Sequence, residues 1–222
     1  MDEWLFEQVN QFAIATPWLH PVIVGYATYG VVLFAALLLA GWWSARRARQ
    51  PRKMAAALLA GVSILAAVAV NQPIVAMVHE ARPYTTHTGI LVLAHRSGDL
   101  SFPSDHATMA GAAAAGLWLV SRRLGLVTTI AALAMSFARV YIAAHYPQDV
   151  AAGLLLGAAV AMTVYLPART LTTRLVIAVG RTPLRPLAQH RRHTTPWRAH
   201  GCEQGPPGDA IVARSRNQPN GP

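Results

Sequence analysis

The amino-acid sequence predicts an all-α integral membrane protein, built as a bundle of five to six helices. Hydrophobic residues make up 54% of the 222-residue chain and charged residues only 13%, about half the charged share of an average soluble domain. Five apolar segments reach or approach the ~20 residues that a helix needs to cross a bilayer. The net charge of +10 comes mostly from arginines in short clusters between these segments and in the C-terminal region, a distribution that argues against a nucleic-acid-binding protein.

Five segments are predicted to cross the membrane, at residues 19–43, 54–78, 104–120, 124–144 and 149–166. Trp42 and Trp43 suit the aromatic belt at the end of the first of them. Residues 2–15 mix apolar and polar side chains, which predicts either an amphipathic helix in the interface or a sixth, short spanning helix. The apolar run at 171–179 is too short to span. Small residues between Gly111 and Gly116 indicate close helix packing.

The basic residues predict the orientation of the bundle. If five helices span, three basic segments lie on one side: residues 46–53, residues 122–123 and the region after residue 168. The positive-inside rule makes that side cytoplasmic. The loops at 78–104 and 144–149 then face the outside of a plasma membrane. These two loops carry most of the side chains that could take part in catalysis or ligand binding.

The chain is predicted to divide near residue 180. Residues 1–180 are expected to form the membrane-embedded domain. Residues 181–222 carry recurring prolines among arginine, histidine, glutamine and glycine. Such a composition cannot bury a core, so this stretch is predicted to be a basic, disordered cytoplasmic tail. Its arginines either attract anionic headgroups or are simply solvated.

The block Ser101-Phe-Pro-Ser-Asp-His106 opens the third apolar segment. Pro103 ends any preceding structure, and Ser104 is a favoured N-cap residue. The backbone N–H groups of Asp105 and His106 are then free to bind an anion such as phosphate at a helix N-terminus. The imidazole of His106 can act as acid or base near neutral pH. Taken alone, the block also fits a plain helix cap with a histidine at the interface.

A further block joins the fourth segment to the fifth. Arg139 lies near the outer end of an apolar helix, where a charge is costly unless it faces a polar site. Pro147 suits the first turn of the fifth helix. His145 and Asp149 flank this proline, and a carboxylate that holds one ring N–H leaves the other ring nitrogen basic, as in nucleophile-activating arrangements. A polar turn in which Asp149 merely stabilises the helix start explains the same residues.

Arg82 is, after Arg139, the second arginine predicted to lie at the outer end of a membrane-spanning helix. Pro83 is expected to end the helix that carries Arg82. The guanidinium group presents a fork of donors that matches a phosphate group. Two arginines, one helix N-terminus and two histidines on the same side of the membrane therefore predict an anion site of phosphate size.

Three motifs, Arg82-Pro83, Pro103-Ser-Asp-His106 and Arg139-x5-His145-x3-Asp149, resemble the signature blocks of the type 2 phosphatidic acid phosphatase family. The resemblance covers roughly residues 70–165, and the spacing within the third block matches fully. Most members carry glycine where this chain has Asp105. That aspartate makes the second block most similar to the bacterial undecaprenyl-diphosphatases of the bacitracin-resistance type.

The resemblance implies an enzyme with a role for each residue. His145 is expected to attack phosphorus and carry a phosphohistidine, with Asp149 orienting its ring. His106 is expected to protonate the leaving oxygen and then to activate water. The residues expected to bind the substrate phosphate are Arg82, Ser104, Asp105 and Arg139. The family works without a metal, so the resemblance implies no metal site and no cofactor.

Two positions depart from the family pattern, and both changes are expected to weaken phosphate binding because each removes a hydrogen-bond donor. Val75 stands where the family has a lysine, seven residues before Arg82, and Ala138 stands where the third block usually begins with serine. Position 75, His79 and Arg82 are expected to share one face of the second helix. We therefore expect Arg96 of the following loop, alone or together with His79, to supply the missing positive charge to the substrate phosphate. A solvated or headgroup-facing Arg96 is the alternative.

The resemblance favours a metal-independent lipid phosphatase that converts an undecaprenyl-type polyprenyl diphosphate into the monophosphate. Phosphatidic acid, phosphatidylglycerol phosphate and a prenyl-linked sugar phosphate fit the same site. The haloperoxidases that share this site are soluble, so the apolar spans argue against them. A transporter or a non-catalytic anion-binding membrane protein is the alternative of another class. The pair His106 and His145, which anion binding alone does not require, favours the enzyme.

Overall fold

The computed structural model describes residues 2–180, and within this range every regular element is a helix. The fold class predicted from the sequence is therefore confirmed. The tail predicted for residues 181–222 lies outside the described range. The elements are α1 (Asp2–Ala15), a 3-10 turn η1 (Pro17–Leu19), α2 (His20–Arg47), α3 (Pro51–Val78), α4 (Pro83–Thr86), α5 (Asp105–Val120), α6 (Arg122–Tyr141) and α7 (Pro147–Val179).

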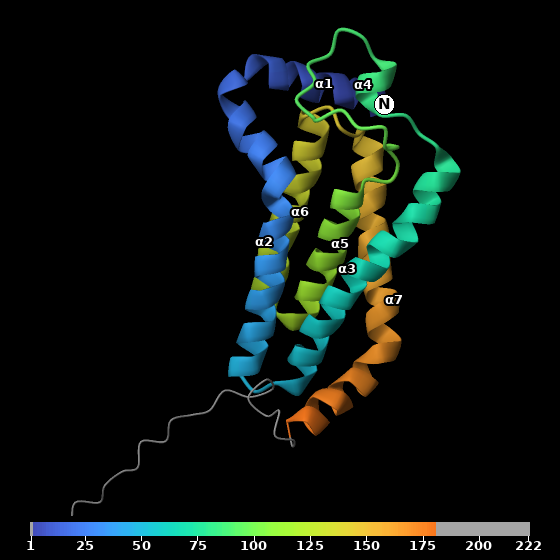
Figure 1. Ribbon diagram of the computed structural model, residues 1–222. Coiled ribbons are helices and arrows are strands. Elements are labelled where there is room, and N and C mark those ends of the chain that lie inside the picture. Colours follow the sequence, from blue (N-terminus) through green and yellow to red (C-terminus); the bar gives the residue numbers. More distant parts are fainter. Residues whose placement is uncertain (1, 181–222) are drawn as a thin grey trace, which may run out of the picture. The chain divides into compact units, whose positions relative to one another are not determined.

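Five helices, α2, α3, α5, α6 and α7, run up and down the bundle, and α1 lies across one end of it (Figure 1). Four stretches are long and apolar enough to cross a membrane: Pro17–Arg47, Pro51–Thr86, Arg122–Tyr141 and Pro147–Val179. The helix α5 was also predicted to span. It has 16 residues, or about 24 Å of helix, and it packs against α3, α6 and α7 inside the bundle.

The helix α1 resolves the two alternatives that its sequence left open. It has 14 residues and is not among the candidate spans. Phe6, Asn10 and Ala13 are buried against the bundle, whereas Trp4 and Phe12 are exposed. The exposed face of α1 mixes such apolar side chains with polar ones such as Glu7, and the helix lies across the end of the bundle (Figure 1). This arrangement suits the membrane interface and favours the interfacial alternative.

Two prolines lie inside long helices, Pro73 in α3 and Pro167 in α7. Proline removes one backbone hydrogen bond and clashes with the preceding turn, so it bends a helix, and both helices bend in Figure 1. The predicted fifth span ended at residue 166, and residues 171–179 were set apart from it. That division is wrong, because α7 continues through Pro167 to Val179 as one bent helix.

The helices α5 and α7 approach each other closely through glycines. A Cβ atom added at Gly157 would overlap the carbonyl oxygen of Thr108, and one added at Gly153 would lie 2.7 Å from the carbonyl oxygen of Ser104. Gly111 of α5 meets the backbone of α7 in the same way. The close packing predicted from the small residues is therefore present. It holds the first turn of α5 beside the first turn of α7, where the candidate site lies.

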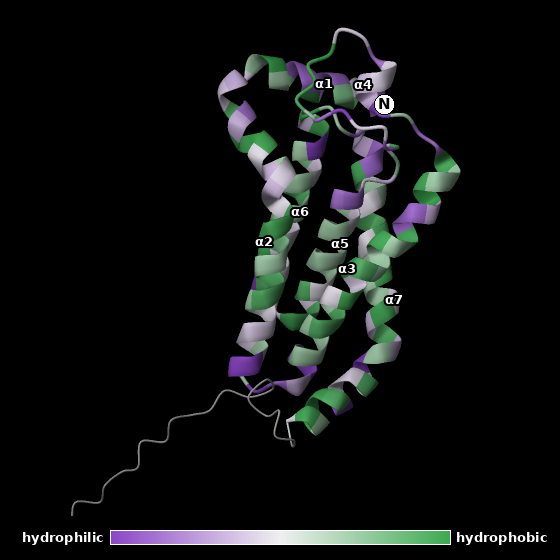
Figure 2. Cartoon of the chain, in the orientation of Figure 1, coloured by the Kyte–Doolittle hydropathy of each residue, from purple (hydrophilic) through white to green (hydrophobic). Residues whose placement is uncertain are grey.

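The surface divides into an apolar middle and two polar ends. Large apolar side chains such as Leu65, Leu155 and Leu39 are more than 60% exposed. Figure 2 shows the hydrophobic colour along the middle of the long helices and the hydrophilic colour mainly toward the ends. Soluble monomeric proteins rarely expose this much apolar surface, whereas a bilayer solvates it.

The basic segments lie at one end of this bundle. The α2–α3 turn, the α5–α6 turn and the described end of α7 lie together there (Figure 1), and each carries arginines. The segments 79–104 and 142–146 lie at the opposite end, beside α1. The sequence therefore correctly predicted which segments share an end.

Candidate active site

The loop that joins α6 to α7 carries His145, whose side chain is 3% exposed. Its Nδ1 atom lies 2.8 Å from the carbonyl oxygen of Ser101. A carbonyl oxygen can only accept, so Nδ1 carries the proton and donates it. The other ring nitrogen, Nε2, then keeps its lone pair and lies 3.3 Å from Nη2 of Arg139. The lone pair of Nε2 thus accepts a hydrogen bond from the guanidinium group of Arg139.

Asp149 helps to position His145 through Ser101, which contacts both residues. Its side chain is fully buried, and its Oδ2 accepts hydrogen bonds from the Tyr146 N–H at 2.8 Å and from the Ser101 hydroxyl. The same Oδ2 lies 3.6 Å from Nδ1 of His145, too far for a hydrogen bond. We expected Asp149 to hold the ring N–H directly. That expectation needs correction, because the carbonyl oxygen of Ser101 is the acceptor and Asp149 holds Ser101.

Ser101 is the residue at this site that sequence reasoning missed. It is fully buried, and it contacts both His145 and Asp149 from a loop more than forty residues earlier. Its position as the first residue of the Ser101–His106 block could have identified it as a site residue. That block was interpreted only through its helix start, so the first residue received no role.

The first turn of α5 begins as predicted, with Ser104 at the N-cap position. The Ser104 hydroxyl makes no capping bond, and its oxygen is buried without a hydrogen-bond partner within residues 2–180. The Ser104 N–H donates to the carbonyl oxygen of Asp149 at 3.1 Å, which ties the starts of α5 and α7 together. His106 follows two residues later. It is close enough to Arg139, His145 and Arg82 to interact electrostatically with each of them.

The two predicted arginines reach the site from different elements. Arg139 is in the last turn of α6, and its Nε atom is buried without a partner in the described part of the chain. Arg82 precedes α4; its Nε donates to the carbonyl oxygen of Asp99 at 3.0 Å, and its Nη2 lies 3.9 Å from the Asp99 carboxylate. Forked donors with unused hydrogen-bonding capacity can bind a phosphate group.

The helix α3 ends at Val78, where the predicted span ends, and does not continue to Arg82 as the Arg82-Pro83 motif predicted. His79, with φ of 54°, takes the left-handed conformation and caps the helix after Val78, and Arg82 is extended. Val75, His79 and Arg82 therefore do not share a helix face, and that prediction is wrong. Arg96 is exposed and makes no hydrogen bond or ion pair with another described residue. Its binding of the substrate phosphate stays a prediction.

Asp105 is tied to α3. Its Oδ1 accepts hydrogen bonds from Asn71 at 2.6 Å and from Gln72 at 3.0 Å, and the fully buried Asn71 also donates to the carbonyl oxygen of Pro103 at 3.1 Å. Two amides thus hold the turn that begins α5. The side chain of Asp105 is engaged with them, so only its backbone N–H matches the predicted phosphate contact, which stays a prediction. The sequence did not reveal the role of Asn71, because an asparagine in an apolar helix can serve several structural or functional roles.

The electrostatics of the site keep His145 neutral. Burial lowers the pKa of His145 below its usual value of about 6.5, and the charge of Arg139 lowers it further, whereas Asp149 raises it. The net direction is downward, because desolvation is the largest cause. A neutral ring at neutral pH is the form that can attack phosphorus.

The N-terminal helix and the loops hold one another over the site. Asn10 of α1 exchanges two hydrogen bonds with the backbone of Leu91, at 2.8 and 3.1 Å. The hydroxyl groups of Thr86 and Tyr146 lie 2.7 Å apart, and the Gln148 N–H donates to Asp2 at 2.9 Å. Within residues 2–180, no group of three or more His, Cys, Asp or Glu side chains could hold a metal ion.

A family profile described as the PAP2 superfamily matches residues 56–172 of this chain. The chain belongs to the PAP2 superfamily. The matched range contains every candidate site residue, and the resemblance inferred from the three motifs is confirmed.

Relatives extend the PAP2 assignment. Undecaprenyl-diphosphatase BcrC of Bacillus subtilis is 31% identical over 154 residues, which cover 69% of this chain and 77% of the relative. A decaprenylphosphoryl-5-phosphoribose phosphatase of Mycobacterium tuberculosis is 38% identical over 111 residues, which cover 50% of this chain and 60% of that one. With PAP2 membership, these relatives identify the protein as a lipid phosphatase.

A solved structure shares the fold. The PAP2-type phosphatidylglycerolphosphate phosphatase of Bacillus subtilis matches with a TM-score of 0.56 and 20% identity, over 76% of this chain and 87% of that one. That protein is a transmembrane enzyme. The two chains therefore share one fold, and this PAP2 protein has four candidate membrane spans of its own within residues 2–180.

Proposed function

We propose that this PAP2 enzyme hydrolyses an undecaprenyl-type polyprenyl diphosphate to the monophosphate, through a phosphohistidine on His145. The observation that carries the proposal is the imidazole geometry: Nδ1 donates to the carbonyl oxygen of Ser101, and the unprotonated Nε2 accepts a hydrogen bond from Arg139, a residue proposed to bind the phosphate. The substrate class rests on the relative BcrC, which aligns over most of both chains.

The first step forms the covalent intermediate. The lone pair of Nε2 attacks the terminal phosphorus, and the bond from phosphorus to the bridging oxygen breaks. The lipid monophosphate leaves and takes a proton from His106 on its bridging oxygen. Arg82, Arg139 and the Ser104 hydroxyl stabilise the charge that develops on the phosphoryl oxygens. The buried and unpartnered Ser104 Oγ and Arg139 Nε support this step, because they are donors with nothing else to bind among the described residues.

The second step releases phosphate. Water attacks the phosphohistidine, His106 accepts a proton from it, and the bond from phosphorus to Nε2 breaks. Inorganic phosphate leaves, and the ring of His145 returns to its neutral form. Ser101 and Asp149 hold the ring orientation through both steps, because both are fully buried and hydrogen-bonded to each other.

We infer that the site opens on the extracytoplasmic side of the cell membrane. The support is the gathering of basic segments at the opposite end of the bundle, combined with the positive-inside rule. Single cysteines test it after Cys202 is replaced. With an impermeant reagent added outside cells, Thr86→Cys is expected to react and Ala48→Cys to stay unlabelled. The reverse pattern would place the site in the cytoplasm.

Phosphate release from a panel of lipids tests the substrate. Purified protein in detergent, without added metal, is given undecaprenyl diphosphate, phosphatidic acid, phosphatidylglycerol phosphate and a decaprenylphosphoryl phosphoribose phosphate. The diphosphate is expected to have the highest kcat/KM. The phosphoribose substrate is the serious rival, because its relative is 38% identical over half of this chain. Faster hydrolysis of that substrate would replace the proposed one and keep the mechanism.

The intermediate is tested separately. Protein quenched during turnover of a diphosphate labelled on its terminal phosphate is expected to carry label that acid removes and base does not, as a phosphohistidine requires. The variant His145→Ala is the control and is expected to carry none. Label that persists in this variant would contradict the covalent route.

A further inference from the structure

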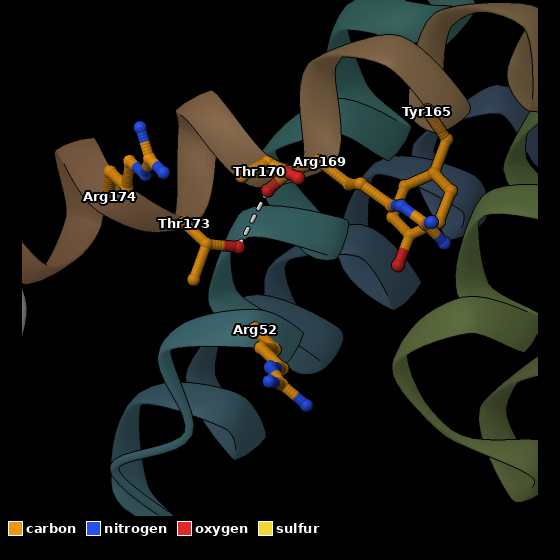
Figure 3. Close-up of a pocket in the computed structure, with 6 residues that line it drawn as sticks. All are labelled: Arg52, Tyr165, Arg169, Thr170, Thr173 and Arg174. Carbon is orange, nitrogen blue, oxygen red and sulfur yellow. Dashed lines mark hydrogen bonds between the residues drawn. The ribbon is translucent and has the colours of Figure 1, made fainter.

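The end of the bundle opposite the candidate active site holds a second group of arginines, and these line a pocket of about 530 Å³ (Figure 3). This volume lies within the range of roughly 300–1,000 Å³ found for ligand pockets. No residue of the candidate active site belongs to it. The lining residues are Arg52 of α3, with Tyr165, Arg169, Thr170, Thr173 and Arg174 of α7.

The bend in α7 builds this pocket. Before the bend at Pro167, Tyr165 packs against the buried cluster that contains Leu117. After the bend, Val176 packs against Met54 near the start of α3. The helix therefore arches over the beginning of α3 and touches the bundle on both sides of the arch. The pocket lies under this arch, between two packed contacts that fix its shape.

The charge of the pocket is uncompensated. None of the described residues that line it is acidic, and the guanidinium groups of Arg52, Arg169 and Arg174 make no hydrogen bond or ion pair within residues 2–180. The Thr173 hydroxyl donates to the carbonyl oxygen of Arg169 at 2.6 Å, whereas the Thr170 hydroxyl is uncommitted among the described residues. The three guanidinium groups point in different directions around the pocket (Figure 3), so its lining is positively charged throughout. Positive charge attracts an anion, and forked guanidinium donors match phosphate oxygens.

The surroundings of the pocket belong to the membrane surface. On the same turns of α7, Leu166, Leu171 and Leu175 are 52–63% exposed. At the same end of the bundle, Trp42 and Trp43 close α2, as residues of an aromatic belt do. A ligand with a phosphate group and acyl chains would satisfy the arginines and cover the leucines together, which a free phosphate ion would not.

We propose that this pocket binds the phosphate headgroup of an anionic phospholipid. The lipid is a bound component and not a substrate, since the candidate active site is at the other end of the bundle. The site is thus independent of the hydrolysis proposed above. Basic pockets between membrane helices bind lipid headgroups by the same chemistry.

Lipid-dependent thermal unfolding tests the proposal. Purified protein in neutral detergent is titrated with phosphatidylglycerol, with phosphatidylcholine and with orthophosphate, and affinities follow from the rise in Tm. Phosphatidylglycerol is expected to stabilise the wild type more than the other two do. At about fivefold in affinity for each arginine, Arg169→Ala/Arg174→Ala is expected to weaken phosphatidylglycerol binding ~25-fold. The matched control is Arg122→Ala/Arg123→Ala, which removes two charges from the same end outside the pocket.

A second variant tests the shape of the pocket without changing its charge. Thr170→Trp keeps every arginine and fills part of the cavity, and it is expected to lower the affinity for phosphatidylglycerol as well. Equal affinity for this lipid in the wild type and in both pocket variants would overturn the proposal. If orthophosphate binds as tightly as the lipid and the pocket variants lose that binding, the lipid is overturned as the source of the phosphate. No arm depends on turnover, so failure here is distinct from failure of the proposed hydrolysis.

Discussion

Arginines stand at both ends of this bundle, and the two ends hold them in different ways. Arg139 is in the last turn of α6, with Nη2 3.3 Å from His145 and a buried Nε atom. Its neighbours Ser101, Ser104 and Asp149 are fully buried. At the other end, Arg52, Arg169 and Arg174 are exposed and form no ion pair with another described residue.

The difference teaches what each end can do. Chemistry at phosphorus requires donors and a nucleophile fixed before the substrate arrives, and buried hydrogen bonds fix them at the first end. Attraction of an anionic headgroup requires charge at the right depth, and long exposed side chains supply it without being fixed. Buried polar groups should therefore be sensitive to single substitutions, and exposed ones should tolerate them.

The largest effect is expected from His145→Ala, because the variant has no atom that can attack phosphorus. Removal of a catalytic nucleophile costs on the order of 10⁶-fold in a well-studied hydrolase, and phosphate release should fall to background here. His95→Ala is the matched control, because His95 is an exposed histidine of the neighbouring loop. Initial rates with the best substrate of the panel measure both. A rate within tenfold of wild type for His145→Ala would refute its assignment as the nucleophile.

Gly157→Val should disrupt the site from a distance. Its side chain would overlap the carbonyl oxygen of Thr108, so α5 and α7 must separate. Overpacking of this kind costs about 1–3 kcal/mol or more of folding free energy, and a fall in Tm in detergent with loss of activity is expected. Gly61→Val is the control, because nothing lies within 4 Å of the added Cβ at Gly61. Equal Tm values for the two variants would show that the helices separate without cost.

Ser101→Ala tests the residue that bridges His145 and Asp149. The variant keeps the carbonyl oxygen that fixes Nδ1 but removes one donor to a buried carboxylate. A hydrogen bond to a charged group is worth about 1.5–3 kcal/mol, so kcat should fall roughly 10–100-fold. Ser121→Ala, a change at a helix start whose side chain makes no capping bond, should leave kcat unchanged. An unchanged kcat in Ser101→Ala would mean that Asp149 acts without this hydroxyl.

The pH dependence of kcat/KM should show a shifted acid limb. Burial lowers the pKa of His145, so the ring stays neutral and reactive as the pH falls below 6.5, and activity is lost only at the lower pKa. Asp149 raises that pKa. Asp149→Asn should therefore move the acid limb to still lower pH, in addition to reducing the rate. A shift toward higher pH in this variant would contradict the electrostatic role given to the carboxylate.

The smallest effect is expected from Asp99→Asn. Asp99 contacts Arg82, but its side chain is 77% exposed and its carboxylate lies 3.9 Å away. An exposed ion pair contributes little, and the carbonyl oxygen of residue 99 still accepts from Arg82. We expect kcat/KM within about threefold of wild type. A tenfold loss would show that exposure does not predict tolerance at this end.

Local patterns in the sequence predicted the helices and the shared end of the basic loops, because both depend on runs of similar residues. Motifs predicted His145, Asp149 and Arg139, which fall within eleven consecutive positions. The roles of Ser101 and Asn71 depend on contacts across 44 and 34 residues, and no local pattern reports them. The fifth span was predicted to end too early, at residue 166, for a related reason: Pro167 bends α7 without ending it, because neighbours support the helix on both sides of the bend.

The contacts of α1 also bear on how the protein is made. This helix leaves the ribosome before the rest of the bundle, yet the partner of Asn10 is 81 residues later and the partner of Asp2 is 146 residues later. Neither partner exists in the membrane when α1 is synthesised. The helix must wait at the membrane surface until α7 is inserted, and its docking is then among the last events of biogenesis. A segment translated before the rest of the bundle thus completes the end of the molecule where His145 lies.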